Sequence, residues 1–344
     1  MRSSQNLQRY RICGIITKNY SKKGRMAMQA KDSQVVSQAQ KIISQVRRVV
    51  VGKDKTLLWV LAAVLAKGHI LLEDIPGVGK TTMALAFSKT LGLSYNRVQF
   101  TPDVLPSDVT GYSILNQATG TMLYQPGAVL CNLFLADELN RATSRTQSAL
   151  LEAMEEGQVT VDGTTHKLPS PFVVIATQNP TGAAGTQLLP DSQMDRFMVR
   201  LSLGYPSPKD EINMVLNRQG QDPLRMLTQL LEPSDVAIMQ ETVAQTHVSI
   251  DVVKYIVELI GATRQNENIA RGASPRTTLA VTAMAKAVAQ LRGRDYVVPK
   301  DVQEVFSCVT AHRLLLSERA EGKGLTAEQV LKQILDGVEA PKLR

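Results

Sequence analysis

The sequence predicts an α/β protein in which a doubly wound parallel sheet is followed by a smaller all-helical domain. Short apolar runs alternate with longer helical patterns from about residue 35 to 205, as expected for a sheet covered by helices on both faces. The first of these runs leads into a glycine-rich turn. After about residue 207 the strand-like runs largely vanish and helical periodicity takes over.

Five apolar runs are the predicted strands of the sheet. Several of them are apolar at consecutive positions, which is typical of strands buried on both faces. The long segments between them leave room for the crossover helices that parallel strands require. The runs are HILLED (69–74), RVQF (97–100), NLFLAD (132–137), FVVIATQ (172–178) and MVRLSL (198–203).

Two apolar patterns at helical spacing predict helices in the C-terminal part. The first face is Leu279, Ala283, Ala287 and Leu291, and the second is Val302, Val305, Phe306 and Val309. Pro299 and Asp301 suit the first turn of the second helix. We therefore divide the chain into a tail (1–34), a nucleotide-binding domain (35–206) and a helical domain (207–344).

The positive charge of the chain is concentrated at its N-terminus. The formal net charge is +8, but residues 1–31 hold eight basic side chains and no acidic one, so the remainder carries 31 of each sign. A polar, acid-poor tail is expected to be disordered, and it holds no run long enough for a membrane span. Three widely spaced cysteines and four scattered histidines predict neither disulfides nor a zinc site, and they fit the reducing cytoplasm.

The stretch EDIPGVGKTT (73–82) has the elements of a phosphate-binding loop. Gly77 and Gly79 let the backbone approach an anion closely, Lys80 supplies positive charge, and Thr81 supplies a hydroxyl for Mg²⁺. The usual fingerprint has a glycine where this chain has Asp74, but that residue ends the strand, so its carboxylate can point away from the anion. The predicted nucleotide-binding residues here are Pro76, Gly77, Val78, Gly79, Lys80, Thr81 and Thr82.

Two further motifs follow strands of the same sheet. Asp137 and Glu138 come at the carboxyl end of the third run, where ligands bind in a doubly wound sheet. Asp137 is a candidate Mg²⁺ residue, with Thr81, and Glu138 a candidate base for the attacking water. Asn179 follows the fourth run and could help to place that water. Together the motifs predict a Mg²⁺–ATP site.

The order of these motifs resembles the MoxR family of AAA+ ATPases. The resemblance rests on EDIPGVGKTT, FLADELNRATSRTQSALLEAME, VIATQNP, SQMDRFMVRLSLGYP and RGASPRTTLAV, and it covers about residues 35–310. The family commonly has a residue other than glycine at the position of Asp74. The resemblance implies a cytoplasmic ATPase with a P-loop AAA+ fold and a helical lid. It also implies assembly into a homo-oligomeric ring, which in the family pattern is a hexamer.

The resemblance also implies roles for individual residues. Asn179 becomes the first sensor, Arg196 the arginine finger that reaches a neighbouring subunit, and Arg276 a second sensor that acts within its own subunit. Val51 and Gly52 match the segment beside the adenine. Because Arg141 also sits near a potential interface, the choice between Arg196 and Arg141 as the finger stays open.

The implied function is chaperone-like: remodelling, assembly or cofactor maturation of a client protein, for which the family suggests a partner with a von Willebrand factor A-type domain. Residues 101–127 and 157–169 match inserts that usually line the pore or contact clients. Two alternatives are a nucleic-acid motor and a nucleotide-gated binding module. The neutral body and an aromatic content of 4% count against the first, and intact Glu138 and Asn179 against the second.

Overall fold

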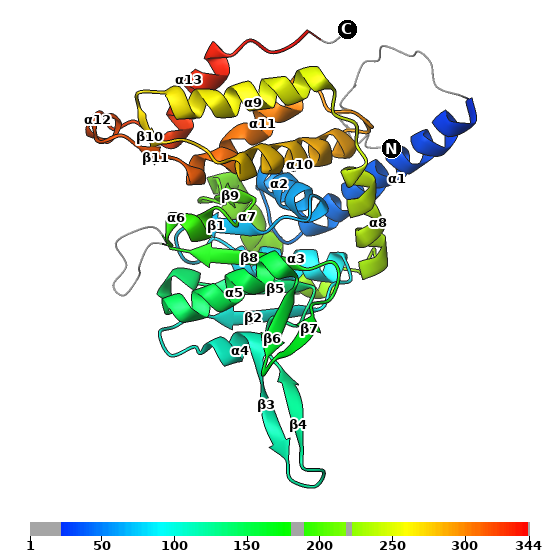
Figure 1. Ribbon diagram of the computed structural model, residues 1–344. Helices are drawn as coiled ribbons and strands as arrows, with labels where there is room; N and C mark the ends of the chain where they lie inside the picture. Colours follow the sequence, from blue (N-terminus) through cyan, green and yellow to red (C-terminus); the bar gives the residue numbers. More distant parts are fainter. Residues whose placement is uncertain (1–21, 180–188, 218–221, 343–344) are drawn as a thin grey trace.

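The computed structural model describes residues 22–179, 189–217 and 222–342 and places a five-stranded parallel sheet at the centre of the molecule (Figure 1). The strand order is β2-β5-β8-β1-β9. All five predicted strands are confirmed: β1 (Ile70–Glu73), β2 (Tyr95–Gln99), β5 (Leu133–Asp137), β8 (Val173–Gln178) and β9 (Val199–Leu201). Because β8 lies between β1 and β5, residues that follow these three strands meet at one edge of the sheet.

Alternate residues of the strands enter two separate hydrophobic cores, one on each face of the sheet, because successive side chains of a strand point to opposite faces. Ile70 and Leu72 of β1 join the core that also holds helices α1–α3 and the C-terminal helices. Leu71 joins the other core, with α5. Both faces are therefore covered, and the predicted doubly wound arrangement is confirmed.

The helices of the nucleotide-binding part connect these strands. They are α1 (Lys22–Val46), α2 (Asp54–Leu65), α3 (Lys80–Thr90), α4 (Pro106–Thr110), α5 (Ser144–Glu156) and α6 (Asp191–Met194), with a 3-10 turn η1 (Leu139–Arg141) after β5. The predicted helix after the glycine-rich turn corresponds to α3.

Two hairpins form the inserts recognised in the sequence. The first consists of β3 (Gly111–Asn116) and β4 (Thr121–Pro126), and it projects from the body of the molecule (Figure 1). The second consists of β6 (Gln158–Val161) and β7 (Thr164–Lys167) and directly follows α5. Tyr124 and His166 stack at a centroid distance of 3.7 Å and so join the two hairpins.

Helices dominate the C-terminal part, above the sheet in Figure 1. They are α7 (Pro208–Asn217), α8 (Pro233–Ala244), α9 (Ile250–Gln265), α10 (Pro275–Leu291), α11 (Pro299–Thr310), α12 (Glu318–Gly322) and α13 (Ala327–Gly337), with 3-10 turns η2 (Pro223–Met226) and η3 (Ala311–Arg313). The prediction of an all-helical domain needs one correction, because β10 (Ile269–Arg271) and β11 (Leu315–Leu316) pair antiparallel. Both strands are too short to stand out from the helical pattern.

The predicted apolar face of α11 is buried, but the face predicted for α10 is partly wrong. Val302, Val305, Phe306 and Val309 are all 0% exposed. Leu279 is 73% exposed, and α10 instead buries Val281, Met284 and Val288 against the core. The Ala-rich sequence of α10 made two adjacent stripes nearly equivalent, so spacing alone did not separate them.

The extent of the predicted tail also needs correction. Residues 22–34, expected to be disordered, belong to α1, because good helix formers such as Met26, Ala27 and Gln29 extend the helix backwards from its buried part. The remaining basic stretch, residues 1–21, lies outside the described residues. Within the described ranges, no helix combines the length and the apolar character needed to cross a membrane.

Candidate nucleotide site

The glycine-rich turn between β1 and α3 has the backbone that an anion-binding loop requires. Gly77 and Gly79 have φ angles of +85° and +97°, in the left-handed region that favours glycine. A Cβ atom at either position would meet no protein atom within 4 Å, so both glycines border open space. The N-terminus of α3 points into this loop, and its free N–H groups favour a phosphate there. The loop therefore fits the phosphates of a nucleotide.

Asp74 takes the place of the usual first glycine and turns its carboxylate away from the loop. The side chain accepts hydrogen bonds from Leu203 N (2.5 Å), Gly204 N (2.9 Å) and Ser202 Oγ (2.7 Å), all just after β9. Asp74 therefore fastens the start of the phosphate loop to the neighbouring strand, and its negative charge does not oppose the phosphates directly.

Lys80 is held at the same place by the backbone of Asp74. Its Nζ donates to Asp74 O at 2.7 Å, and the residue is buried. Burial lowers the pKa of the Lys80 ammonium, an effect that the charges of Asp74, Asp137 and Glu138 oppose. Lys80 therefore lies on the same side of the sheet as Asp137 at the end of β5 and Glu138 just after it, whose charges act on its ammonium group. Thr81 and Thr82 lie in the first turn of α3.

Asp137 is anchored by two partners that the sequence did not point to. Arg97 of β2 forms an ion pair with Asp137 Oδ2 at 2.6 Å, and Thr177 of β8 donates to Oδ1 at 2.7 Å. The same Thr177 hydroxyl accepts from Glu138 N. Both partners lie in strands adjacent to β5, and only the strand order, which no local pattern specifies, brings them to Asp137.

Glu138 is held between Arg141 and Asn179. Its Oε2 pairs with Arg141 Nη1 at 2.7 Å, and its Oε1 accepts from Asn179 Nδ2 at 3.3 Å. Glu138 has φ +56°, an uncommon conformation for a residue with a side chain and one that directs its carboxylate toward Asn179. The predicted pair of Glu138 and Asn179 therefore meets in the structure. Arg141 binds the acidic residue of its own subunit.

A cavity of about 430 Å³ opens beside the phosphate loop. It is lined by Pro76, Gly77, Val78, Tyr205, Pro206, Glu211, Met214 and Val215, a mostly apolar set that suits a nucleotide base. The predicted Val51 and Gly52 are not among these residues. Their segment lies behind the cavity, where Gly52 packs against Asp210 and Lys53 donates to Tyr205 O at 2.7 Å. Contact of Val51 and Gly52 with the base stays a prediction.

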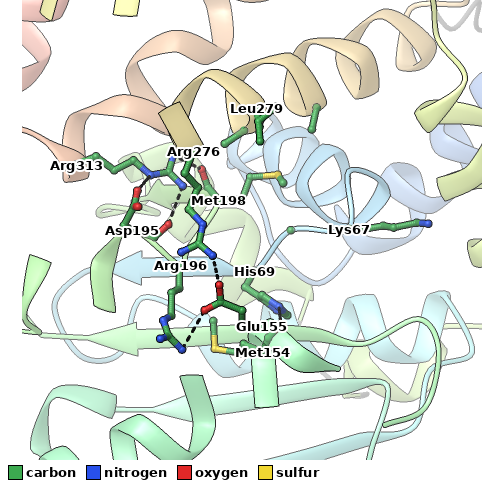
Figure 2. A pocket seen from close by; sticks show the side chains of 13 residues that line it. Lys67, His69, Met154, Glu155, Asp195, Arg196, Met198, Arg276, Leu279 and Arg313 are labelled. Atoms are coloured by element: carbon green, nitrogen blue, oxygen red, sulfur yellow. Dashed lines mark hydrogen bonds and ion pairs between the residues drawn. The ribbon is translucent and has the colours of Figure 1, made fainter. Parts of the chain in front are cut away.

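Arg196 and Arg276 lie together around Glu155, the penultimate residue of α5 (Figure 2). Arg196 Nη1 is 3.3 Å from Glu155 Oε2, and Arg276 binds the other carboxylate oxygen. Both arginines line a cavity of about 320 Å³ that also includes His69, Met198 and the exposed Leu279.

This cavity is at the opposite end of β1 from Lys80. His69, which lines the cavity, precedes β1, and its Nε2 is hydrogen-bonded to Met154 O of α5 at 3.0 Å. Lys80, in contrast, binds Asp74 O, which follows β1. The five residue steps from His69 to Asp74 span about 16 Å of extended chain at about 3.3 Å per residue. The expectation that Arg276 acts within its own subunit stays a prediction, and in this structure its side chain lies beside Arg196 rather than near Lys80. The lid packs so that Arg276 joins Arg196.

Comparisons with known proteins agree with this architecture. Residues 69–199 match the family described as ATPase family associated with various cellular activities (AAA), and residues 261–334 match the AAA lid domain. The fold and site thus define an AAA-type P-loop ATPase with a C-terminal lid, which hydrolyses ATP.

Individual relatives show which family of AAA-type ATPases the chain resembles. The chain is 44% identical to the uncharacterized protein YeaC of Bacillus subtilis over 88% of this chain and 95% of that protein. It is 40% identical to chaperone MoxR1 of Mycobacterium tuberculosis over 88% and 82%, respectively. A crystal structure of a putative ATPase from Cytophaga hutchinsonii superposes with a TM-score of 0.85, at 36% identity, over 93% of this chain and 99% of that one. The chain belongs to the MoxR family of AAA+ ATPases.

Proposed function

We propose that this ATPase works as a homo-oligomeric ring, a hexamer in the pattern of its family, that couples hydrolysis of Mg²⁺–ATP to remodelling, assembly or cofactor maturation of a partner protein. The observation that carries the proposal is the position of Arg196 and Arg276 at the end of β1 remote from Lys80. Guanidinium groups that cannot reach their own site can complete the site of a neighbouring copy. A ring lets every copy both give and receive them.

Within one subunit, the residues around Lys80 bind and orient the reactants. The backbone of the loop and Lys80 hold the phosphates, and Thr81 and Asp137 would hold the Mg²⁺ ion, whose charge neutralises the phosphate oxygens. Arg97 binds Oδ2 of Asp137 and Thr177 donates to Oδ1, so the carboxylate is fixed in orientation, and each oxygen keeps a lone pair for the water shell of the ion. Glu138 takes the proton of the attacking water, and Asn179 orients that water.

The ion pair with Arg141 at 2.7 Å occupies Oε2 of Glu138, so Glu138 must leave Arg141 before this oxygen can accept the proton of the attacking water. We assign Arg141 to the control of Glu138 in its own subunit. Arg196, supported by Arg276, is the preferred residue acting on the neighbouring copy. An arginine supplied in this way stabilises charge that develops during phosphoryl transfer.

The projecting hairpin of β3 and β4 is the proposed contact for the client. No residue from Gly111 to Pro126 is charged, and Leu115 and Met122, which pair across the hairpin, are 60% and 62% exposed. An isolated two-stranded ribbon has no core in which to bury such side chains, and exposed apolar groups of this kind mark interaction sites. A protein with a von Willebrand factor A-type domain is the partner class that the family suggests.

The stacked rings of Tyr124 and His166 connect the proposed client-binding hairpin to the hairpin that follows α5, and so could transmit movement between the client and the ATPase site. Tyr124 belongs to the projecting hairpin, and His166 belongs to the hairpin that directly follows α5 and Glu155. We place the ring in the cytoplasm. The two described cysteines, Cys131 and Cys308, are free thiols, as a reducing compartment favours.

The decisive experiment mixes two inactive variants. Lys80→Ala should lose tight ATP binding, whereas Arg196→Ala and Arg276→Ala should bind ATP and lose most turnover, by about 10³-fold for an arginine acting in trans. A mixture of Lys80→Ala with either arginine variant should regain activity, because an intact Lys80 site can then face an intact arginine neighbour. The result for Arg276 reverses the sequence-based expectation.

Glu138→Gln is the matched control, because it lies in the same site as Lys80. It should bind ATP without turnover, and its mixture with Lys80→Ala should stay inactive, since neither chain then offers a complete site. If the arginine mixtures stay inactive while mixed rings form, the assignment in trans fails. Rescue by Arg141→Ala instead would move the role to Arg141.

The client can be sought with the Glu138→Gln protein, which should hold ATP and its partner together. Replacement of Leu115 and Met122 by serine in this background should abolish capture of the partner without changing ATP binding. Serine at the exposed Ile238 of α8 is the control for a mere loss of surface apolarity. Equal capture by both variants would exclude the hairpin as the contact.

A further inference from the structure

The turn that carries Arg196 is held from the lid by one buried side chain, Arg313 of η3. Arg313 Nη2 donates to Phe197 O at 2.8 Å and to Asp195 O at 3.2 Å, and its Nη1 donates to Val309 O at 2.6 Å. The carbonyl groups on both sides of Arg196 therefore bind one guanidinium group. The side chain of Arg313 is only 3% exposed.

Two further contacts strengthen this connection. His312 Nε2 lies 3.0 Å from Phe197 O, and because a carbonyl only accepts, that nitrogen must carry the proton. Burial and the adjacent Arg313 lower the pKa of His312 well below its usual range, so the ring is neutral. Arg313 Nε is also 2.8 Å from Asp195 Oδ1, an ion-pair distance without the angle of a hydrogen bond.

Asp195 connects the same cluster to the second arginine. Its other carboxylate oxygen accepts from Ser274 Oγ at 3.4 Å, and Ser274 is the residue that immediately precedes α10. Arg276 is the second residue of that helix. Figure 2 shows Arg313 reaching Asp195 above the pair of Arg196 and Arg276. One polar cluster of lid and base residues thus supports both guanidinium groups around Glu155.

Burial of the Arg313 charge is costly and would not be needed only to join two domains. Burial lowers the pKa of its guanidinium to about 10, with Asp195 opposing the shift, so the group stays charged at neutral pH. Apolar side chains of similar volume often replace buried ion pairs with no loss of stability. What an apolar side chain cannot do is bind the carbonyl oxygens that fix the direction of a turn.

We infer that Arg313 is a positioning residue for the site of the neighbouring subunit: through Asp195 and Phe197 it holds the turn of Arg196 to the lid, so that Arg196 and Arg276 move as one unit. This inference rests on the proposed action of Arg196 in trans. Movement of the lid during the ATP cycle would then shift both arginines relative to the neighbour's phosphates.

The test replaces Arg313 by lysine, which keeps the charge but loses the planar fork of donors. Arg313→Lys should bind a fluorescent ATP analogue with unchanged Kd, because Lys80 lies at the other end of β1. Its kcat should fall about 10²-fold, as for a misplacement of about 1 Å. Mixing it with Lys80→Ala should restore activity, since Arg196 of the Lys80→Ala chain is correctly held.

Arg294→Lys is the matched control. Arg294 also pairs with a buried carboxylate, that of Asp301, but both residues belong to the lid and neither touches the turn of Arg196. This variant should keep the wild-type kcat. His312→Ala, which removes one donor to Phe197 O and leaves the ion pair, is the second variant in case Arg313→Lys does not fold. It should show a smaller loss of kcat and the same restoration.

The mixture of Arg196→Ala with Lys80→Ala separates the inference from the proposed ring function. If that reference mixture regains activity and the mixtures of Arg313→Lys and His312→Ala do not, the positioning role is overturned and the ring stands. An equal loss of kcat in Arg294→Lys would also overturn it, because any weakening of the lid would then suffice. If the reference mixture stays inactive, the trans arrangement and this inference fail together.

Discussion

Asp74 departs from the usual phosphate-loop fingerprint, which has a glycine there, and yet it stabilises the start of that loop. A glycine at this position would lack the carboxylate that binds Leu203 N, Gly204 N and Ser202 Oγ. The sequence predicted that the carboxylate points away from the anion, and this prediction is confirmed. Its partners could not be predicted, because they follow β9, more than a hundred residues later in the chain.

We expect that Asp74→Gly, which restores the usual fingerprint, destabilises the protein. The buried N–H group of Leu203 and the half-buried N–H group of Gly204 would lose a charged acceptor, which costs about 2–4 kcal/mol of the free energy of unfolding. Urea unfolding followed by circular dichroism would measure this loss. Asp74→Asn keeps one acceptor oxygen and should lose less. Equal stability of Asp74→Gly and wild type would show that the carboxylate contributes nothing.

His69 predicts a loss of stability in acid. The imidazole is buried between Met154 O and Val174 N, so its Nε2 donates and its Nδ1 accepts. Burial lowers its pKa from 6.5 to about 4. A depressed histidine pKa means that the unfolded chain binds the extra proton, so the stabilising contribution is present above pH 6.5 and is lost as the pH falls toward 4. The loss is about 3 kcal/mol.

His69→Gln separates this contribution from that of the carboxylates. A glutamine amide can donate to Met154 O and accept from Val174 N, but it does not titrate. The free energy of unfolding, measured from pH 7 to 4.5, should fall more steeply for wild type than for His69→Gln. Parallel curves would mean that His69 binds its proton at the same pH in the folded and the unfolded chain, so that burial does not lower its pKa.

Whole elements were predictable wherever their own pattern was strong. The central strands β1, β5 and β8 are largely apolar runs, and α11 has a single unambiguous apolar stripe, so these elements were predicted correctly. The stripe of α10 was misassigned because alanine is tolerated on either face. Arg97 and Thr177 were missed because each is unremarkable within its own strand, and only the strand order makes them partners of Asp137.

Helix α1 allows a prediction about the tail. Where burial in α1 is described, from residue 34 on, its buried residues are Val35, Ala39, Ile42 and Val46, which pack in the core shared by α3 and α10. A chain that starts at Asp32 keeps all four, so it should fold and hydrolyse ATP like the full chain. Removal of residues 1–46 exposes the surface that Val35, Ile42 and Val46 cover.

The longer truncation should therefore cost roughly 5 kcal/mol of the free energy of unfolding, since each large apolar side chain contributes about 1.5–3 kcal/mol. Thermal unfolding and ATPase rates of the two truncated proteins would check both expectations. A cooperative transition like that of wild type after removal of 1–46 would show that α1 is not part of the fold. Loss of turnover on removal of 1–31 alone would assign a role to the tail.

The packing of the lid against the sheet was the feature of the structure that the sequence predicted least well. Arg276 was recognised from GASPR, but its motif does not say against which edge of the sheet the lid packs. The core shared by α2, α10 and α11 decides this, and it places Arg276 beside Arg196 and Glu155 rather than near Lys80. The residues to which we assign one reaction thus lie at the two ends of β1.

This division predicts that turnover depends on assembly whereas nucleotide binding does not. Lys80 and the phosphate loop belong to one chain, so a dilute subunit should bind an ATP analogue with the same Kd as an assembled one. If hydrolysis needs Arg196 of a second chain, as proposed, kcat per chain should rise with protein concentration and level off where light scattering reports complete rings. Arg196→Ala should show the same assembly and a flat, low rate. A constant kcat per chain across the assembly transition would mean that each subunit holds a complete site, and Arg141, which already contacts Glu138 within its own chain, would then be the arginine to examine.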